Sequence, residues 1–237
     1  MGRGATLTRS IALFRAFLRE QSDPDQFYAT LATDTVGQVG GHVRLAGSLV
    51  LDVGGGPGYF AGAFRSAGAV YAQVEPDADV LGCPPGTVRA RGEALPVRTG
   101  AVDVCFSSNV LEHVPLPWAL TAEMVRVTRP GGTLFLAFTP WLSPWGGHET
   151  SPWHYLGGER ARRRYRRRHG REPKNRFGVS LFPVSVGDAL RWARSCPEVD
   201  VVAAFPRYHP WWASWVVALP GLREVLCWNV VLVLRRR

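Results

Sequence analysis

The chain has 237 residues, a formal net charge of +9 and four scattered cysteines. That length supports one domain with a substantial core, and the cysteines lack the spacing of a metal site or a disulfide framework, which favours a reduced, cytoplasmic setting. We expect neither a secretory signal nor a membrane-spanning helix, because polar residues interrupt every long apolar segment. Lys174 is the only lysine, and so much arginine is also typical of a GC-rich genome.

Helical and strand-like segments alternate along the chain. Two or three helices are expected within residues 5–45, where Asp23-Pro24 is a typical helix start. Short apolar segments then predict seven strands, at residues 48–53, 70–75, 87–90, 102–107, 133–138, 199–205 and 228–234. Further helices are predicted at residues 59–67, 118–128 and 185–195. The alternation predicts an α/β fold, with inserts at about 140–184 and 207–226 after the fifth and sixth strands.

The most specific motif is the run Leu51-Asp52-Val53-Gly54-Gly55-Gly56-Pro57-Gly58, in which a buried strand enters a glycine-rich turn. Its spaced glycines allow a sharp turn and let the backbone approach a ligand. The helix predicted after the turn would direct its N-terminus at that ligand. A tight strand-to-helix turn without a ligand is the alternative, although such a turn needs neither three spaced glycines nor an acid.

The spacing of this turn distinguishes among the nucleotides it could bind. A dinucleotide fingerprint requires glycine where this chain has Tyr59, and a P-loop requires a lysine followed by serine or threonine. Asp52 lies directly before the turn and would repel a pyrophosphate. Its carboxylate instead suits a ligand that carries an ammonium or sulfonium group.

The order of the motifs resembles that of class I S-adenosylmethionine-dependent methyltransferases over about residues 46–140. The matching blocks are residues 51–58, 74–77, 93–104, 107–114 and 125–138. The resemblance implies a Rossmann-like, seven-stranded mixed sheet with helices on both faces and an antiparallel seventh strand. More narrowly, the chain is similar to a group of uncharacterised mycobacterial and actinobacterial methyltransferases. The blocks that carry this similarity are residues 23–28, 146–149, 154–158 and 205–210.

The resemblance implies S-adenosyl-L-methionine as the cofactor. Its expected binding residues are Asp52, Gly54, Gly56, Gly58, Glu75, Gly92 and Asn109. Glu75 ends the second predicted strand, close to the spacing at which an acid bonds ribose hydroxyls. The resemblance places the cofactor's methionine part against the main chain of Gly54 and the carbonyl of Asn109, and its adenine against Gly92. Arg91 occupies the position where the family usually has an aspartate that bonds adenine. Backbone contacts would therefore have to bind the adenine in this chain.

Methyl transfer needs few catalytic side chains, because the sulfonium is already activated. Alignment of the nucleophile, the methyl group and the sulfur supplies most of the acceleration. An oxygen nucleophile would also need a base. The candidate catalytic residues are His113, His148, Glu149 and His154. His113 follows the fourth predicted strand near the family's methyl site, and the other three lie in the first insert. The alternative for each is a purely structural contact.

A metal is not expected from the sequence. In some relatives a trio like Asn109, Glu112 and His113 binds a divalent ion. Asparagine is a poorer ligand than glutamate for such an ion, so the site residues include no metal ligand.

The inserts carry two unusual surfaces. Arginines dominate residues 160–171, a helical-looking run that would attract nucleic acid, anionic lipid or a phosphorylated acceptor, unless it is only a solvated face. Trp211, Trp212 and Trp215 belong to an aromatic and apolar patch that fits either a membrane interface or packing on the sheet. The block at 107–110 lacks the Pro-Pro-aromatic signature of enzymes that methylate base amino groups.

These features predict a single methyltransferase domain over residues 1–237. Its expected parts are helices at 1–45, a cofactor-binding core at 46–140, a substrate-side insert at 140–184 and a C-terminal part at 185–237. The predicted reaction is in-line methyl transfer to a small lipid, glycolipid or other amphiphilic or anionic acceptor. An RNA methyltransferase that uses the arginine-rich insert, or a non-catalytic cofactor-binding module, are the alternatives. A cytoplasmic protein with peripheral contact to the inner face of the membrane is expected.

Overall fold

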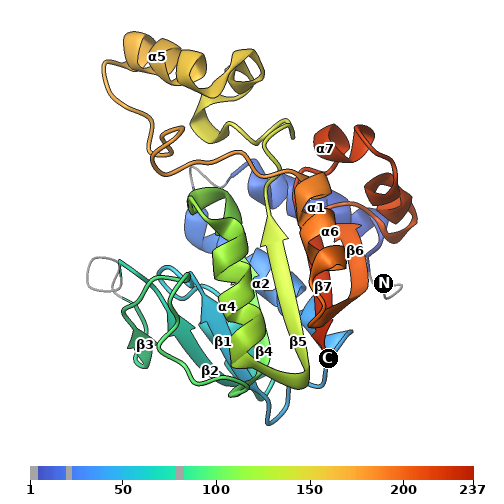
Figure 1. The fold of residues 1–237 in the computed structure, drawn as a ribbon. Helices are drawn as coiled ribbons and strands as arrows, with labels where there is room; N and C mark the ends of the chain where they lie inside the picture. The colour runs from blue at the N-terminus through green and yellow to red at the C-terminus, as the bar shows by residue number, and fades with distance from the viewer. Residues whose placement is uncertain (1–4, 20–22, 78–82) are drawn as a thin grey trace.

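The computed structural model describes residues 5–19, 23–77 and 83–237. Its core is one seven-stranded sheet in the order β3-β2-β1-β4-β5-β7-β6 (Figure 1). The strands are β1 (Leu49–Val53), β2 (Val70–Val74), β3 (Thr87–Val88), β4 (Val102–Ser108), β5 (Thr128–Phe138), β6 (Val199–Pro206) and β7 (Val230–Arg236). β7 runs antiparallel to β5 and β6, and the other pairs are parallel. This confirms the Rossmann-like mixed sheet predicted from the sequence.

Side chains cap the first turn of some of the helices. The α-helices are α1 (Leu7–Phe17), α2 (Pro24–Gly40), α3 (Ala61–Ser66), α4 (Pro117–Val127), α5 (Gly158–His169), α6 (Val186–Ser195) and α7 (Leu222–Leu226). Short 3-10 helices are η1 (Leu111–His113), η2 (His148–Thr150), η3 (Trp153–Leu156) and η4 (Trp211–Ala218). At α2 the Asp23 carboxylate accepts the N–H of Gln26 at 3.1 Å, and at α6 the Ser185 hydroxyl accepts the N–H of Asp188 at 2.9 Å.

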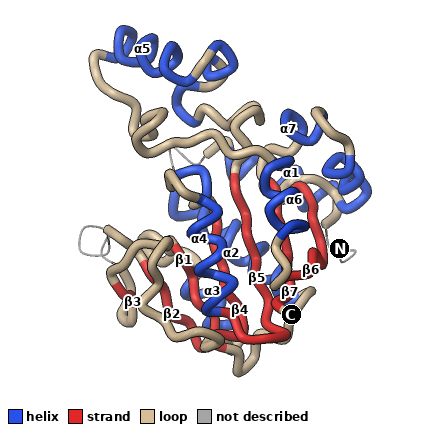
Figure 2. The backbone as a smooth tube through the Cα atoms, viewed as in Figure 1, coloured by secondary structure: helices blue, strands red, loops and turns tan. Residues whose placement is uncertain are grey.

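Helices cover both faces of the sheet (Figure 2). Alternate residues of β1 show how each face is filled. Val50 packs in a cluster with Leu31 of α2 and Phe64 of α3, whereas Leu51 packs in a second cluster with Leu120 of α4. Because both faces are covered, the strands are continuous apolar runs, which is why they could be predicted from the sequence.

The two inserts lie at the end of the sheet where β5 ends, and α5 projects furthest from the sheet (Figure 1). The strand predicted at 133–138 begins earlier, at Thr128, and the pairing of β5 with β4 shifts register between Val102 and Val104. The helix expected from residue 59 begins at Ala61. Across residues 5–19, 23–77 and 83–237, no helix has the length and apolar character needed to cross a bilayer.

Candidate active site

The glycine turn after β1 adopts a backbone that favours glycine. Gly54, Gly56 and Gly58 have φ angles of +79°, +53° and +85°. A Cβ on Gly54 would lie 2.5 Å from Cγ2 of Val110, whereas a Cβ on Gly56 would meet no atom within 4 Å. Gly54 is therefore needed for close packing, and Gly56 faces open space in which a ligand could approach the backbone.

Asp52 lies beneath this turn. The residue is 1% exposed, and its carboxylate accepts a hydrogen bond from the Tyr71 hydroxyl at 2.7 Å. Burial raises the pKa of Asp52 to about 7, with the hydrogen bond from Tyr71 opposing the shift and the charge of Glu75 adding to it. The expected contact between Asp52 and a cationic ligand stays a prediction. In this structure the carboxylate bonds the hydroxyl of Tyr71 in β2.

Glu75 follows β2 and reaches the same turn. Its Oε2 accepts the N–H of Gly56 at 2.9 Å, and its Oε1 accepts the N–H of Asp77 at 3.2 Å. Two backbone donors thus fix the carboxylate beside the glycines, at the carboxyl end of the sheet. Each oxygen keeps a further lone pair with which it could accept a ribose hydroxyl.

The segment expected to contact adenine packs between β1 and α4. A Cβ on Gly92 would come 2.5 Å from Cδ1 of Leu120 and 3.2 Å from Cγ1 of Val53, so the missing side chain permits this close approach. Arg91 points outward, with a side chain 75% exposed and Nε 3.8 Å from Oε2 of Glu93. An adenine contact by Gly92 stays a prediction.

Asn109 lies directly after β4, between the cofactor turn and a cavity. Its φ angle is +58°, which is uncommon outside glycine and is best tolerated by asparagine and aspartate. The N–H of Asn109 donates to the carbonyl of Ala137 at 2.7 Å, and its Oδ1 accepts from Nδ2 of Asn229 at 2.9 Å. These bonds fix the peptide that the family resemblance assigns to the cofactor's methionine part.

A cavity of about 480 Å³ adjoins Asn109. Its apolar part is lined by Leu18 and by the aromatic residues Phe14, Phe17, Phe27, Tyr28, Trp145, Tyr208 and Trp228. Tyr28 stacks on Tyr59, with ring centroids 4.3 Å apart, so the cavity wall continues into the cofactor turn. The sequence did not predict this lining, because aromatic residues at helical spacing are also typical of an ordinary core.

The other end of the cavity is polar. His113, His148, Glu149, Lys174 and Asn175 line it, together with Asn109 and Thr139. The sequence reasoning missed Lys174 and Asn175, which come from the loop after α5.

Two histidines face each other at this polar end, with ring centroids 5.0 Å apart. Nδ1 of His113 lies 2.8 Å from the carbonyl oxygen of Ser180, which can only accept, so Nδ1 carries a hydrogen, and in the tautomer that this bond selects Nε2 is bare. Burial, with the nearby His113 adding to its effect, lowers the pKa of His148 to about 4, so His148 is neutral at pH 7.

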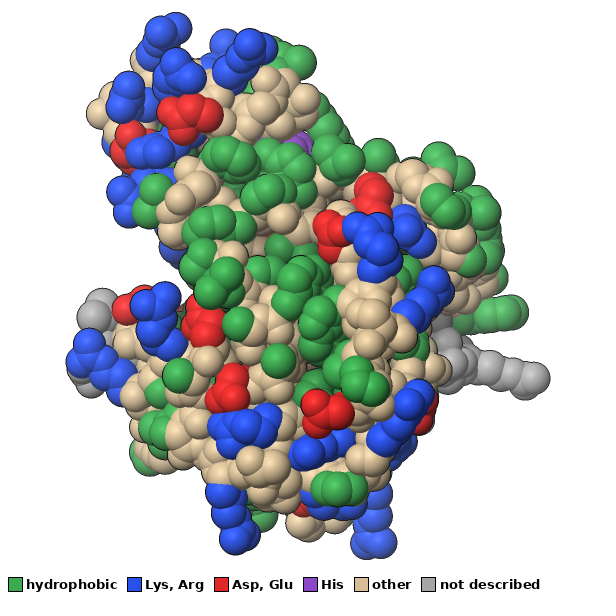
Figure 3. Space-filling view, in the orientation of Figure 1, with side chains coloured by type: hydrophobic (Ala, Val, Ile, Leu, Met, Phe, Trp, Pro, Cys, Tyr) green, Lys and Arg blue, Asp and Glu red, His purple; other side chains and the backbone are tan. Residues whose placement is uncertain are grey.

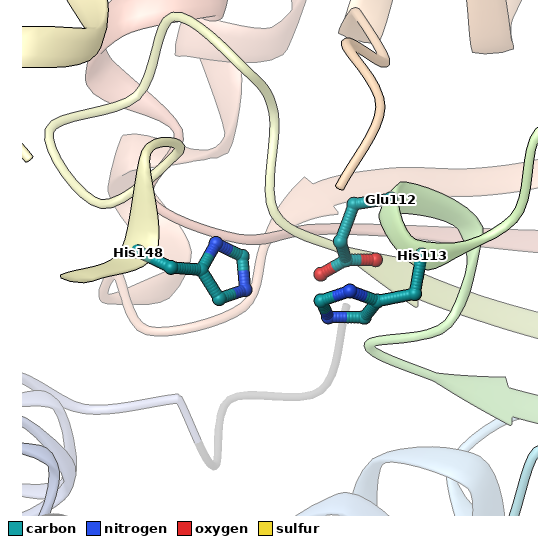
Figure 4. Close-up of side chains that lie close together, drawn as sticks. All are labelled: Glu112, His113 and His148. Atoms are coloured by element: carbon teal, nitrogen blue, oxygen red, sulfur yellow. The ribbon is translucent and has the colours of Figure 1, made fainter. Parts of the chain in front are cut away.

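Glu112 completes a cluster with these histidines (Figure 4). It is 1% exposed. Its Oε1 accepts the N–H of Thr139 at 3.0 Å, and its buried Oε2 has no hydrogen-bond partner among the described residues.

The other two catalytic candidates make structural contacts. Glu149 reaches the cavity, but Nδ2 of Asn175 donates to its Oε1 at 3.0 Å. His154 lies behind the cavity wall, 1% exposed, with Nε2 3.1 Å from the carbonyl oxygen of Ser143. The structure therefore brings together His113, His148 and Glu149 and separates His154 from the cavity. No catalytic role for any of the four is tested by these contacts.

Comparisons with known proteins identify the family. A methyltransferase-domain family matches residues 51–136. An uncharacterized methyltransferase of Mycobacteroides abscessus is 55% identical over 98% of this chain and 96% of its own length. One of Mycolicibacterium gilvum is also 55% identical, over 98% and 95%.

Solved structures share the fold. An S-adenosylmethionine-dependent methyltransferase from Mesorhizobium loti has a TM-score of 0.55 at 19% identity and covers 82% of this chain and 93% of that one. Geranyl diphosphate C-methyltransferase from Streptomyces coelicolor has a TM-score of 0.54 at 16% identity, covering 86% and 77%. The relatives at 55% identity and the methyltransferase-domain match, in agreement with the glycine turn, Glu75 and the sheet order, show that the chain belongs to the S-adenosylmethionine-dependent methyltransferases and uses S-adenosylmethionine as its cofactor.

Proposed function

We propose that this enzyme transfers the methyl group of S-adenosylmethionine to a small amphiphilic acceptor that carries an anionic group. The cavity carries the proposal. Its aromatic part suits an apolar body, and its polar end combines a lysine with hydrogen-bonding groups. Asn109, assigned by resemblance to the cofactor's methionine part, lines that polar end, so the acceptor's reacting atom would lie there.

The chemistry needs alignment and, for an oxygen nucleophile, loss of a proton. The neutral His148 and the bare Nε2 of His113 lie beside the buried carboxylate of Glu112. The polar end thus provides groups that could take up a proton or bind a cation close to the atom that receives the methyl group.

Surface features support a lipid-like acceptor supplied from a membrane interface. Trp211, Trp212 and Trp215 of η4 are 53%, 55% and 56% exposed, which is unusual for side chains of this size. Arginines gather over α5 (Figure 3). Those that line one surface depression there are Arg160, Arg163, Arg164, Arg167 and Arg168. We infer a cytoplasmic enzyme that touches anionic membrane surfaces through these two inserts.

The two alternatives find less support. An RNA acceptor would use the same arginines, but those arginines line a surface depression on α5, and none of them lines the aromatic cavity beside Asn109. A non-catalytic cofactor module would need no acceptor cavity beside the turn.

A labelled-methyl assay tests the proposal. The purified protein and methyl-labelled S-adenosylmethionine are incubated separately with the organic-solvent extract and with the RNA of a strain that lacks the gene. We expect label in an anionic, organic-soluble species. Lys174→Gln should raise KM for that species at least about 10-fold, since one charge-assisted hydrogen bond is lost. Arg176→Gln, an exposed neighbour, is the matched control. Label in RNA alone would overturn the proposal.

A further inference from the structure

Two side chains that line the polar end of the cavity and a third that is buried beside them converge from two distant segments. Glu112 and His113 belong to η1 after β4, and His148 begins η2 in the first insert. One donor atom of each lies within 4.8 Å of the others, and the side chains point toward one another (Figure 4). Donors that share one small ion lie about 3 Å apart, so modest rotamer changes would bring these three around a common point.

Backbone groups orient each member of this cluster. The N–H at Nδ1 of His113 donates to the carbonyl of Ser180 at 2.8 Å, which leaves Nε2 free to bind a cation. Nδ1 of His148 lies 3.4 Å from the carbonyl oxygen of Gly146. The Thr139 N–H holds Oε1 of Glu112 at 3.0 Å. Outer contacts of this kind, a carbonyl on the far imidazole nitrogen and a donor on the far carboxylate oxygen, are typical of metal ligands.

Two features of the cluster fit a bound cation. Oε2 of Glu112 is fully buried and has no hydrogen-bond partner among the described residues, although a buried carboxylate oxygen normally has one. His148 has a φ angle of +50°, a conformation that costs of order 1 kcal/mol outside glycine and clusters at functional sites. That backbone turns the imidazole toward Glu112.

We propose that Glu112, His113 and His148 bind one divalent transition-metal ion. Two imidazoles and one carboxylate suit Mn²⁺, Fe²⁺ or Zn²⁺ better than Mg²⁺, which prefers oxygen ligands. Three protein ligands leave coordination positions open toward the cavity, where an acceptor oxygen could bind. The inference rests on the proposed function for that role, and it differs from the trio weighed from the sequence. The ligand set does not include Asn109, whose Oδ1 is held by Nδ2 of Asn229.

Mn²⁺ binding tests the inference on the full-length, tag-free protein after chelator treatment. The electron paramagnetic resonance signal of free Mn²⁺ is titrated with protein, and Zn²⁺ is then added in competition. We expect one Mn²⁺ site per chain that Zn²⁺ displaces. Glu112→Gln and His148→Ala should each weaken Mn²⁺ binding at least about 10-fold. His169→Ala, at an exposed histidine on α5, should bind as wild type does.

Thermal unfolding of each variant checks that it is folded, and Glu112→Gln keeps the volume of the side chain. Absence of a stoichiometric site in the wild type would overturn the inference. So would equal Mn²⁺ affinity in wild type, Glu112→Gln and His148→Ala. Methyl transfer to an amphiphile by the metal-free protein would exclude a role of the metal in the reaction and leave the proposed function intact. The failure of the inference and the failure of the proposed function are therefore distinguishable.

Discussion

Gly56 is the residue of the cofactor turn at which a side chain would have free space. Its φ angle is +53°, and no atom lies within 4 Å of an added Cβ. The same Cβ would project into the space where a ligand could approach the turn.

Gly56→Ala should therefore lower the affinity for S-adenosylmethionine at least about 10-fold while costing only about 1 kcal/mol of stability for the positive φ angle. Calorimetric titration and urea unfolding measure the two effects. Gly170→Ala is the control, because Gly170 also has a positive φ angle and open space but ends α5. Unchanged cofactor affinity in Gly56→Ala would contradict this geometry.

Asp52 makes stability depend on pH. Its pKa rises from 3.8 to about 7 on folding, so between these values the folded state holds a proton that the unfolded state has lost. The free energy of unfolding should therefore fall as pH rises from about 4 to 7, by up to about 4 kcal/mol from this residue.

Asp52→Asn removes that titration. Urea unfolding over this range should show the variant gaining stability relative to wild type as pH rises, and the difference should level off above pH 7. Parallel pH profiles for the two proteins would show that Asp52 ionises without a folding penalty.

Arg207, directly after β6, shows how a single side chain connects elements around the cavity. It is fully buried, and burial lowers the pKa of its guanidinium. Its Nη1 donates to Oγ of Ser108 at the end of β4, and its Nη2 donates to Oγ1 of Thr35 in α2. The side chain thus joins α2, which supplies part of the aromatic wall, to two strand ends.

Arg207→Ala should lose about 2–5 kcal/mol of stability, because it leaves a cavity between α2 and the sheet. Arg207→Met should recover most of that loss, because a buried charge contributes little net stability when its volume is refilled. Chemical unfolding of both variants provides the comparison. A methionine variant as unstable as the alanine variant would show that the hydrogen bonds, not the volume, hold α2.

The helices and strands were easier to predict from the sequence than the candidate active site was. Strands β1, β2 and β4 were predicted within a residue or two because buried parallel strands are continuous apolar runs. The α3 helix starts later than expected because the glycine turn extends to Tyr59, whose ring stacks on Tyr28. The sequence placed Glu75 beside the glycines because both follow parallel strands that end at one edge.

The acceptor side was less predictable for a physical reason. His148 meets Glu112 only because the insert folds back over the end of the sheet, and no local pattern specifies that contact. His154 is also a histidine, six positions after His148, but its Nε2 lies against the carbonyl oxygen of Ser143 instead. The aromatic lining comes from α1, α2, both inserts and Trp228 before β7, segments that span most of the chain.

At the scale of the whole molecule, net charge and exposed tryptophans favour an anionic surface as partner. Replacing Arg160, Arg163, Arg167 and Arg168 by glutamine should weaken binding to phosphatidylglycerol vesicles about 100-fold or more, since each arginine near such a surface contributes about 1 kcal/mol. Vesicle flotation at low and high salt measures this, with neutral phosphatidylcholine vesicles as the control. Tight tRNA binding without flotation would instead favour the RNA enzyme.

The identity of the acceptor is the central claim, and comparison of a deletion strain with its parent tests it most directly. Mass spectrometry of lipids and metabolites from both strains should reveal one anionic amphiphile that is lighter by a single CH₂ in the deletion strain. Restoring the wild-type gene should return the heavier species, and restoring Gly56→Ala should not. Unchanged lipids and metabolites together with a lost RNA methyl group would contradict the account.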